Sequence, residues 1–192
     1  MKYILDFDRV LFDTDRFFLC LEEHGLDEIP RGRLLLQKIA GAGINWMDFV
    51  NKDALSFLEE NGTDCAVVSS YVSRNRGDNE KTDSELAFFQ TEKIRLSGIT
   101  ERVSEVKITG NEKHEALTYF AEKYGTDMVF LDDDIEHVAT AHELGYRAMW
   151  LPPKEVSRAS SSAESAPIQK EFETVGTFSD FVQCMRNEAA AA

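Results

Sequence analysis

The sequence has few cysteines and no long hydrophobic run. Its three cysteines form no Cys-x-x-Cys motif and cannot all pair with one another, so we expect free thiols in a reducing compartment. Nowhere do ~18 apolar residues run together, and the first residues show no basic stretch followed by an apolar one. These absences predict a soluble, cytoplasmic protein.

Positive charge is also scarce. Lysine and arginine number 21 against 35 aspartates and glutamates, which gives a formal net charge of −14. Nucleic acids and anionic membranes both bind to basic surfaces, so we expect neither as a general partner. A local cationic pocket remains compatible with this balance. The four histidines show no metal-ligand spacing.

What the chain does have is enough apolar sequence for one core. Its 192 residues are 43% hydrophobic and include 13 phenylalanines, which fits one domain over residues 1–192. Short apolar runs predict strands at residues 3–5, 65–68, 103–109, 128–131 and 148–151, with an edge strand at 172–175.

Segments with one apolar face separate these runs and predict helices. The first expected helix is capped near Asp13 and ended by Gly25, the second runs from Pro30 to Gly41, and the third includes Phe49 and Val50 and is ended by Asn61. The fourth runs from Thr82 to Leu96, and the fifth is capped by Thr109 or Asn111 and ended by Gly125. The sixth is ended by Gly145, and the last runs from Phe178 to Met185. Residues 71–81 and the Ser/Ala-rich residues 154–167 are predicted loops.

Alternating strands and helices predict an α/β fold, a three-layer Rossmann-like and mainly parallel sheet with helices on both faces. Such sheets bind ligands at the carboxyl ends of their strands. Strand alternation predicts that Asp6 and Asp8 point the same way at the end of the first strand. Ser69 follows the second strand, and Asp132 and Asp133 follow the fourth.

Four carboxylates gathered at one edge repel one another and need a cation. Oxygen ligands without a His or Cys cluster favour Mg²⁺. A metal, a hydroxyl from Ser69 and an ammonium from Lys113, in the first turn of its helix, suit a phosphate group. The competing assignments are Ser70 for the hydroxyl and Lys107 for the ammonium. Asp134 is interpreted as a helix N-cap, and Arg74 and Arg76 as a solvated loop that can also meet a substrate anion.

In their order, these motifs resemble the haloacid dehalogenase (HAD) superfamily, in its Mg²⁺-dependent phosphatase and phosphotransferase branch. The matching residues are the stretch from Asp6 to Thr14, Val67 to Ser69, Lys113, and Val129 to Asp133. They span about residues 3–151.

The resemblance implies a role for each of these positions. Asp6 would be the nucleophile that becomes an aspartyl-phosphate, and Asp8 the acid and base, with a pKa raised by its acidic neighbours. Ser69 and Lys113 would hold the phosphoryl oxygens. The metal would lie against Asp132, Asp133, a carboxylate oxygen of Asp6 and the backbone carbonyl of Asp8.

The chain departs from the family pattern at two places. Family members usually have glycine after the second aspartate, where this chain has Arg9, which would cost flexibility or add a cationic arm. The insertion before the second strand is short, so the resemblance implies a reduced helical cap at about residues 15–45. A small cap leaves the site open to larger phosphoesters or to completion by a second subunit of a homo-oligomer.

The sequence thus predicts a Mg²⁺-dependent phosphomonoester hydrolase that acts on a phosphorylated small molecule or a larger phosphoester. Three alternatives remain at this point: a phosphotransferase, a dehalogenase, and a binding or regulatory module that keeps the fold without catalysis. Asp8 argues against dehalogenation, because halide departure needs no acid.

Overall fold

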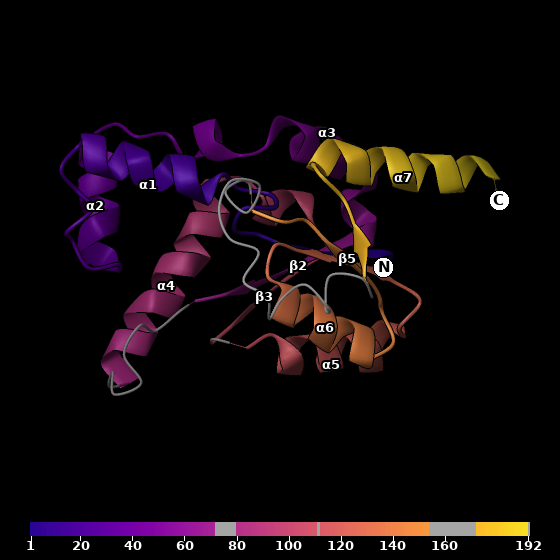
Figure 1. Ribbon diagram of the computed structural model, residues 1–192. Coiled ribbons are helices and arrows are strands. Elements are labelled where there is room, and N and C mark those ends of the chain that lie inside the picture. The colour runs from indigo at the N-terminus through magenta and orange to yellow at the C-terminus, as the bar shows by residue number, and fades with distance from the viewer. Residues whose placement is uncertain (72–79, 111, 154–171, 192) are drawn as a thin grey trace, which may run out of the picture.

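The computed structural model describes residues 1–71, 80–110, 112–153 and 172–191. Its strands are β1 (Tyr3–Asp6), β2 (Cys65–Ser70), β3 (Glu105–Thr109), β4 (Val129–Asp132), β5 (Arg147–Trp150) and β6 (Glu173–Thr174). They form one six-stranded sheet in the order β3-β2-β1-β4-β5-β6, and every neighbouring pair is parallel (Figure 1). The first strand therefore lies at the centre, between β2 and β4.

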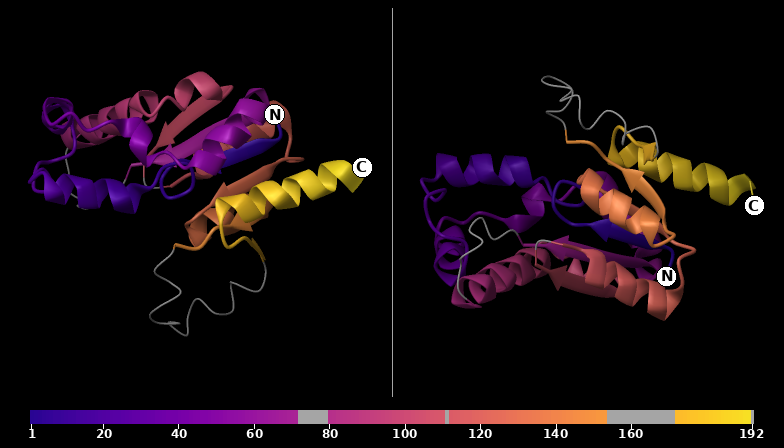
Figure 2. Two further views of the ribbon diagram at one scale, coloured as in Figure 1. Left: turned by 90° about the horizontal axis from the view of Figure 1, so that it is seen from above. Right: turned by 60° about the horizontal axis from the view of Figure 1, so that its bottom comes forward.

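Helices cover both faces of the sheet. They are α1 (Thr14–Glu23), α2 (Arg33–Gly41), α3 (Lys52–Asn61), α4 (Glu80–Leu96), α5 (His114–Tyr124), α6 (Ile135–Glu143) and α7 (Phe178–Ala191), with short 3₁₀ turns at Trp46–Phe49, Gly62–Asp64 and Thr100–Arg102. Helices α5 and α6 lie against one face, and α3 and α7 against the other (Figures 1 and 2). The predicted three-layer α/β fold is confirmed.

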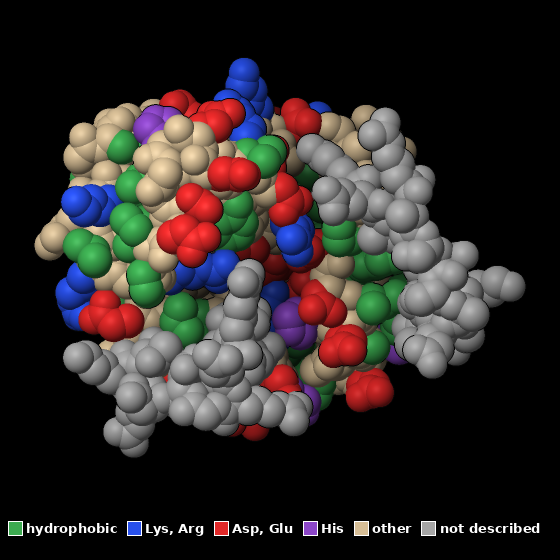
Figure 3. Space-filling model, turned by 60° about the vertical axis from the view of Figure 1, so that its left-hand side comes forward, with side chains coloured by type: hydrophobic (Ala, Val, Ile, Leu, Met, Phe, Trp, Pro, Cys, Tyr) green, Lys and Arg blue, Asp and Glu red, His purple; other side chains and the backbone are tan. Residues whose placement is uncertain are grey.

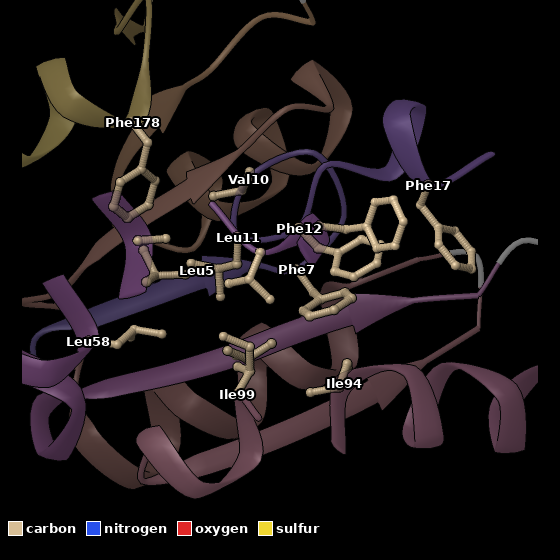
Figure 4. Close-up of a cluster of buried hydrophobic side chains, with 14 of the residues drawn as sticks. Leu5, Phe7, Val10, Leu11, Phe12, Phe17, Leu58, Ile94, Ile99 and Phe178 are labelled. Carbon is tan, nitrogen blue, oxygen red and sulfur yellow. The ribbon is translucent and has the colours of Figure 1, made fainter. Parts of the chain in front are cut away.

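Alternation along the central strands divides the core into two clusters. Leu5 and Val67 pack with Leu58 of α3 and Phe178 of α7 on one face (Figure 4). The other face buries Ile4, Ala66, Val68, Phe130, Leu117 and Phe120. Burying a side chain such as Leu5 contributes about 1.5–3 kcal/mol relative to exposing it, so both clusters fix the register of the central strands.

Several predicted boundaries were wrong. Phe49 and Val50 lie before α3, because Asn51 forms its N-cap and accepts a hydrogen bond from the amide of Asp53 at 3.0 Å. Helix α4 begins at Glu80, before the predicted start at Thr82, and α7 continues beyond Met185 to Ala191.

Two further helices begin later than predicted. Helix α2 starts at Arg33 rather than at Pro30. Helix α5 starts at His114, with Lys113 at the N-cap position and without a side-chain hydrogen bond from Thr109 or any neighbour. Asn111, the loop arginines Arg74 and Arg76, and the whole Ser/Ala-rich segment at residues 154–167 lie outside the described residues.

The helices of the predicted cap are α1 and α2, which lie together at one side of the sheet (Figure 1). Helix α4 reaches from the sheet to this pair. Arg33 of α2 forms an ion pair with Glu85 of α4, and its guanidinium lies 4.2 Å from the ring centre of Phe88. Helix α4 therefore contacts both the cap helices and the sheet.

No helix within the described ranges is long and apolar enough to cross a lipid bilayer.

Candidate active site

A tight turn directs the first two aspartates into a cavity. Asp6 ends β1, and the chain folds back at once, with the amide of Phe12 donating to the carbonyl of Phe7 at 2.9 Å. The apolar side chains of the turn, Phe7, Val10, Leu11 and Phe12, are buried (Figure 4). Their packing anchors the turn, so the polar side chains are left to face the cavity.

Three carboxylates meet at the carboxyl ends of β1 and β4. Asp6, Asp132 and Asp133 each offer an oxygen, and these atoms all lie within 4.8 Å of one another. Asp6 and Asp132 are buried, and Asp133 is partly buried. Parallel pairing of β1 with β4 produces this gathering, because both strands end at the same edge. Asp134 is the N-cap of α6, as predicted.

Lys113 joins two of these carboxylates. Its ammonium forms an ion pair with Asp6 and lies 2.7 Å from an oxygen of Asp132, and its side chain is only 2% exposed. It is at the N-cap position of α5 rather than inside the first turn. The rival assignment, Lys107, lies instead 3.8 Å from Glu105 on β3.

The two serines at the end of β2 have different surroundings. Ser69 is fully buried, and its hydroxyl accepts a hydrogen bond from Gln90 at 2.8 Å. Ser70 lines the cavity. Strand alternation places Ser70 on the same face as Val68, which is also the face of Asp6. Of the two hydroxyls, that of Ser70 is open to the cavity.

Asp8 has a separate set of partners. Strand β1 ends at Asp6, so the alternation that we expected to align the two aspartates does not extend to Asp8. One carboxylate oxygen accepts hydrogen bonds from Thr14 and from the ammonium of Lys93. The other accepts from Gln90 at 2.6 Å. Neither Lys93 nor Gln90 was among the site residues predicted from the sequence.

The one signal for these two residues is their position on α4. Gln90 and Lys93 are three residues apart, and both are buried among the apolar residues Phe89 and Ile94. Residues three apart lie on one side of a helix. A buried lysine is rare without a partner, but the sequence does not show that position 93 is buried.

The pKa values of the carboxylate group reflect crowding. Burial raises the pKa of Asp6 well above its usual value, although the charge of Lys113 opposes the shift. Burial and the charge of Asp132 raise the pKa of Asp133 to about 6. Burial alone would raise the pKa of Asp132, but the charges and hydrogen bonds of Lys113 and His137 together outweigh it and lower that pKa. Three carboxylates face the ammonium of Lys113 and the guanidinium of Arg9, and a further cation would relieve the negative charge that remains.

The pKa of Asp8 is lowered, whereas we expected it to be raised. Burial acts in the expected direction, but the charge of Lys93 and the hydrogen bonds from Lys93, Thr14 and Gln90 outweigh it. The expectation was wrong because it considered only the acidic neighbours. Asp8 is held as a carboxylate.

Arg9 lies at the mouth of the site. Its backbone φ of 60° falls in the left-handed region, where side chains other than glycine are uncommon. Its guanidinium lies 3.0 Å from Asp15 in the first turn of α1 and 3.5 Å from Asp133. The arginine thus provides the cationic arm expected from the sequence, and the arm links the cap helix to the carboxylate group.

These residues surround a cavity of about 340 Å³. It is lined by residues from the strand ends and from α4, and by Phe18 and Arg31 from the segment that contains the cap helices. Figure 3 shows acidic, basic and histidine side chains gathered around a hollow. His137 lies 3.5 Å from Asp132 at its edge. The cavity therefore lies between the sheet edge and the predicted cap.

The residues present fit a hard divalent cation. The group of possible ligands found in the described residues consists of carboxylates alone, and two of the three are buried in a position that water cannot fully solvate. Mg²⁺ prefers such oxygen ligands and is usually held by one or two carboxylates together with water and substrate oxygens. Asp6, Asp132 and Asp133 would hold it.

No family model matches this chain, and no curated protein matches it. Solved structures do match. A protein from Burkholderia xenovorans LB400 described as a haloacid dehalogenase-like hydrolase has 20% sequence identity and a TM-score of 0.61, with 94% of each chain covered. The L-2-haloacid dehalogenase from Xanthobacter autotrophicus has 12% identity and a TM-score of 0.50, covering 96% of this chain and 98% of that chain.

The β-phosphoglucomutase from Clostridium difficile is similar to the same degree. It has 12% identity and a TM-score of 0.51, covering 100% of this chain and 99% of that chain. These matches include two different chemistries, and at such identities they establish the fold alone. The protein has the haloacid dehalogenase-like fold, so the resemblance carried by its motifs is confirmed at the level of the fold.

Proposed function

We propose that the protein is a Mg²⁺-dependent phosphomonoester hydrolase that acts through an aspartyl-phosphate at Asp6. The observation that carries the proposal is the meeting of Asp6, Asp132 and Asp133 within 4.8 Å, at the edge of the sheet where such folds bind ligands. When bound, the metal would supply positive charge to the phosphoryl oxygens. The haloacid dehalogenase-like fold supports a hydrolase in general.

In the first step, a carboxylate oxygen of Asp6 attacks phosphorus, and the bond from phosphorus to the ester oxygen breaks. Asp8, which is ionised in the free site, takes up a proton from solvent and gives it to that oxygen, which leaves as an alcohol. Lys113 holds the attacking carboxylate in place through its ion pair with Asp6. Ser70 replaces Ser69 in our assignment as the hydroxyl that binds a phosphoryl oxygen, because Ser70 lines the cavity and Ser69 is buried.

In the second step, water attacks the phosphorus of the aspartyl-phosphate. Asp8 accepts the proton of this water, the bond from phosphorus to Asp6 breaks, and inorganic phosphate leaves. The lowered pKa of Asp8 suits this step, since the group is then ionised and ready to accept a proton. Aryl phosphates suit the first step, because an acidic phenol departs with little help from an acid.

The cavity supports a small substrate. Its volume of about 340 Å³ is near the lower end of the range for small-molecule sites. A phosphorylated small molecule thus fits better than the macromolecular phosphoester that a reduced cap would admit. Asp8 remains the feature that favours phosphoester chemistry over dehalogenation.

The test is hydrolysis of an aryl phosphate by the wild type and by Asp6→Asn, each with Mg²⁺ and with a chelator. We expect turnover only in the wild type with Mg²⁺. Asp127→Asn is the matched control, since Asp127 is exposed and lies in the loop before β4, outside the cavity lining. Equal rates for the wild type and Asp6→Asn, or turnover without metal, would contradict the proposal. Release of halide from a 2-haloacid would favour the dehalogenase instead.

A further inference from the structure

Two polar side chains of α4 are buried beside the cavity without a role in the steps above. Gln90 is 6% exposed and Lys93 is 2% exposed. Because they are three residues apart, they share one side of α4, and both line the cavity. A lysine loses its hydration when it is buried at this depth, so its location needs a compensating interaction.

That interaction is with Asp8. The ammonium of Lys93 forms an ion pair with one oxygen of the Asp8 carboxylate. Gln90 donates to the other oxygen at 2.6 Å and to the hydroxyl of Ser69 at 2.8 Å. With Thr14 also donating to the first oxygen, both carboxylate oxygens have a donor. The side chain of Asp8 nevertheless stays 29% exposed, so a molecule in the cavity can still contact it.

Aromatic rings surround the same ammonium. It lies 4.6 Å from the ring centre of Phe12, 5.3 Å from that of Phe7 and 5.7 Å from that of Phe17. An apolar side chain of similar length would fill this space without any cost of desolvation. Packing therefore does not call for a charge at position 93, whereas fixing the orientation of Asp8 does.

We propose that Lys93 is a positioning residue for Asp8, and that Gln90 assists it. Asp8 lies on a turn and not on a strand, so the sheet does not fix its carboxylate. Side chains from α4 fix it instead, with Lys93 on one oxygen and Gln90 on the other. The role of Lys93 rests on the proposed function, because it acts through the group that exchanges protons with the ester oxygen and with water.

The experiment compares two esters in the presence of Mg²⁺, an aryl phosphate and an alkyl phosphate. Departure of an alkoxide depends on a proton from Asp8, and departure of an acidic phenol does not. We expect Lys93→Met to lower kcat for the alkyl ester by about 10- to 100-fold and for the aryl ester much less, with KM little changed. Lys93→Arg should restore most of the loss, because it keeps the charge and can reach the same oxygen.

Two further variants keep the test decisive. Gln90→Met removes the donor to the other oxygen of Asp8 and should cause a smaller loss in the same direction, even if Lys93→Met does not fold. In an Asp8→Asn background, Lys93→Met should add no further loss, since residues that act as one unit are not additive. Lys123→Met is the control, as this exposed lysine of α5 pairs with Glu105 and does not line the cavity.

The outcomes separate the two proposals. If the wild type is active, three results would overturn the role of Lys93. Lys93→Met could keep the wild-type rate, its kcat could fall equally for both esters, or it could lower kcat as much in the Asp8→Asn background as it does in the wild type. A wild type that hydrolyses neither ester overturns the proposed function, and the role of Lys93 with it.

Discussion

Two buried lysines line the same cavity, and their environments shift their pKa values in opposite directions. Lys113 lies between two carboxylates, those of Asp6 and Asp132. Burial alone would lower the pKa of Lys113, but the charges of these two groups outweigh it and raise the pKa. Lys93 faces the carboxylate of Asp8 and three aromatic rings. Burial lowers its pKa, and the single carboxylate only partly offsets this.

The two pKa shifts follow the charges nearby. Two carboxylates lie beside Lys113, whereas Lys93 has one carboxylate partner and the like charge of Arg31 close to it. The carboxylates paired with the two lysines also differ, in their burial and in their other hydrogen-bond donors. Asp6 and Asp132 are almost fully buried and depend on Lys113, whereas Asp8 is reached by water and has two other donors. Removing each lysine should therefore have unequal consequences.

Lys113→Met should have the larger effect on stability. It removes the ammonium that lies between two buried carboxylates, and breaking a buried ion pair in this way costs about 3–5 kcal/mol. We expect the free energy of unfolding in metal-free buffer to fall by that amount, as measured by urea denaturation. Mg²⁺ should recover part of the loss, because it supplies the missing charge. A loss below about 1 kcal/mol would contradict this account of Lys113.

Lys93→Met should cost less, about 1–3 kcal/mol in the same measurement. The variant also removes a desolvated ammonium from an aromatic pocket, which offsets part of the lost pairing. Mg²⁺ should give no recovery beyond that of the wild type, because the Asp8 carboxylate is not among the three that meet. If Lys93→Met were the more damaging of the two variants, the proposed difference between the two lysines would be wrong.

The same two lysines show how much of the site the sequence predicts. Lys113 was predicted because it follows a strand and begins a helix, and parallel strands bring such positions to one edge. Asp6, Asp132 and Asp133 were placed by the same reasoning. Lys93 lies in the last turn of α4, and it faces the cavity because of the angle at which this helix packs between the sheet and the cap helices. The periodicity of a helix gives its faces but not this angle.

The choice between two neighbouring hydroxyls has a related origin. The sequence predicts a hydroxyl at the end of β2 and favours Ser69, whereas we propose Ser70, because the choice depends on which residue of the strand faces the cavity. The pKa of Asp8 was predicted in the wrong direction because Lys93, 85 residues away, was not known to be its neighbour. Contacts made at the ends of strands follow from topology, and contacts made by the sides of helices do not.

Arg9 is a third cation of the same site, and unlike the two lysines it lies at the surface. Its ion pairs with Asp15 and Asp133 are partly exposed and should contribute little to stability. Its left-handed backbone costs about 1 kcal/mol, which glycine would not incur. We expect Arg9→Gly to keep or raise the free energy of unfolding by up to about 1 kcal/mol, and to bind Mg²⁺ more tightly because Asp133 loses a competing cation.

Arg9→Ala separates these two effects. It removes the charge but retains the strained backbone, so it should bind Mg²⁺ as Arg9→Gly does and be less stable than the glycine variant. Calorimetric titration with Mg²⁺ and urea denaturation measure the two quantities. Weaker Mg²⁺ binding by both variants would show that Arg9 supports the metal site instead of competing with it.

The smallest effect is expected for a lysine pair outside the cavity. Lys123 donates to Glu105 at 2.8 Å, and hydrogen bonds from Lys123, Tyr119 and Tyr124 lower the pKa of Glu105 even though burial opposes them. Because the folded-state pKa lies below the unfolded one, this pair stabilises the fold above about pH 4.5 and loses its contribution as the pH falls through the folded pKa. Glu105→Gln should therefore lower the Tm by about 1–2 °C at pH 7 and by less at pH 3.5. A constant difference in Tm at both pH values would mean that Glu105 acts through packing and not through its charge.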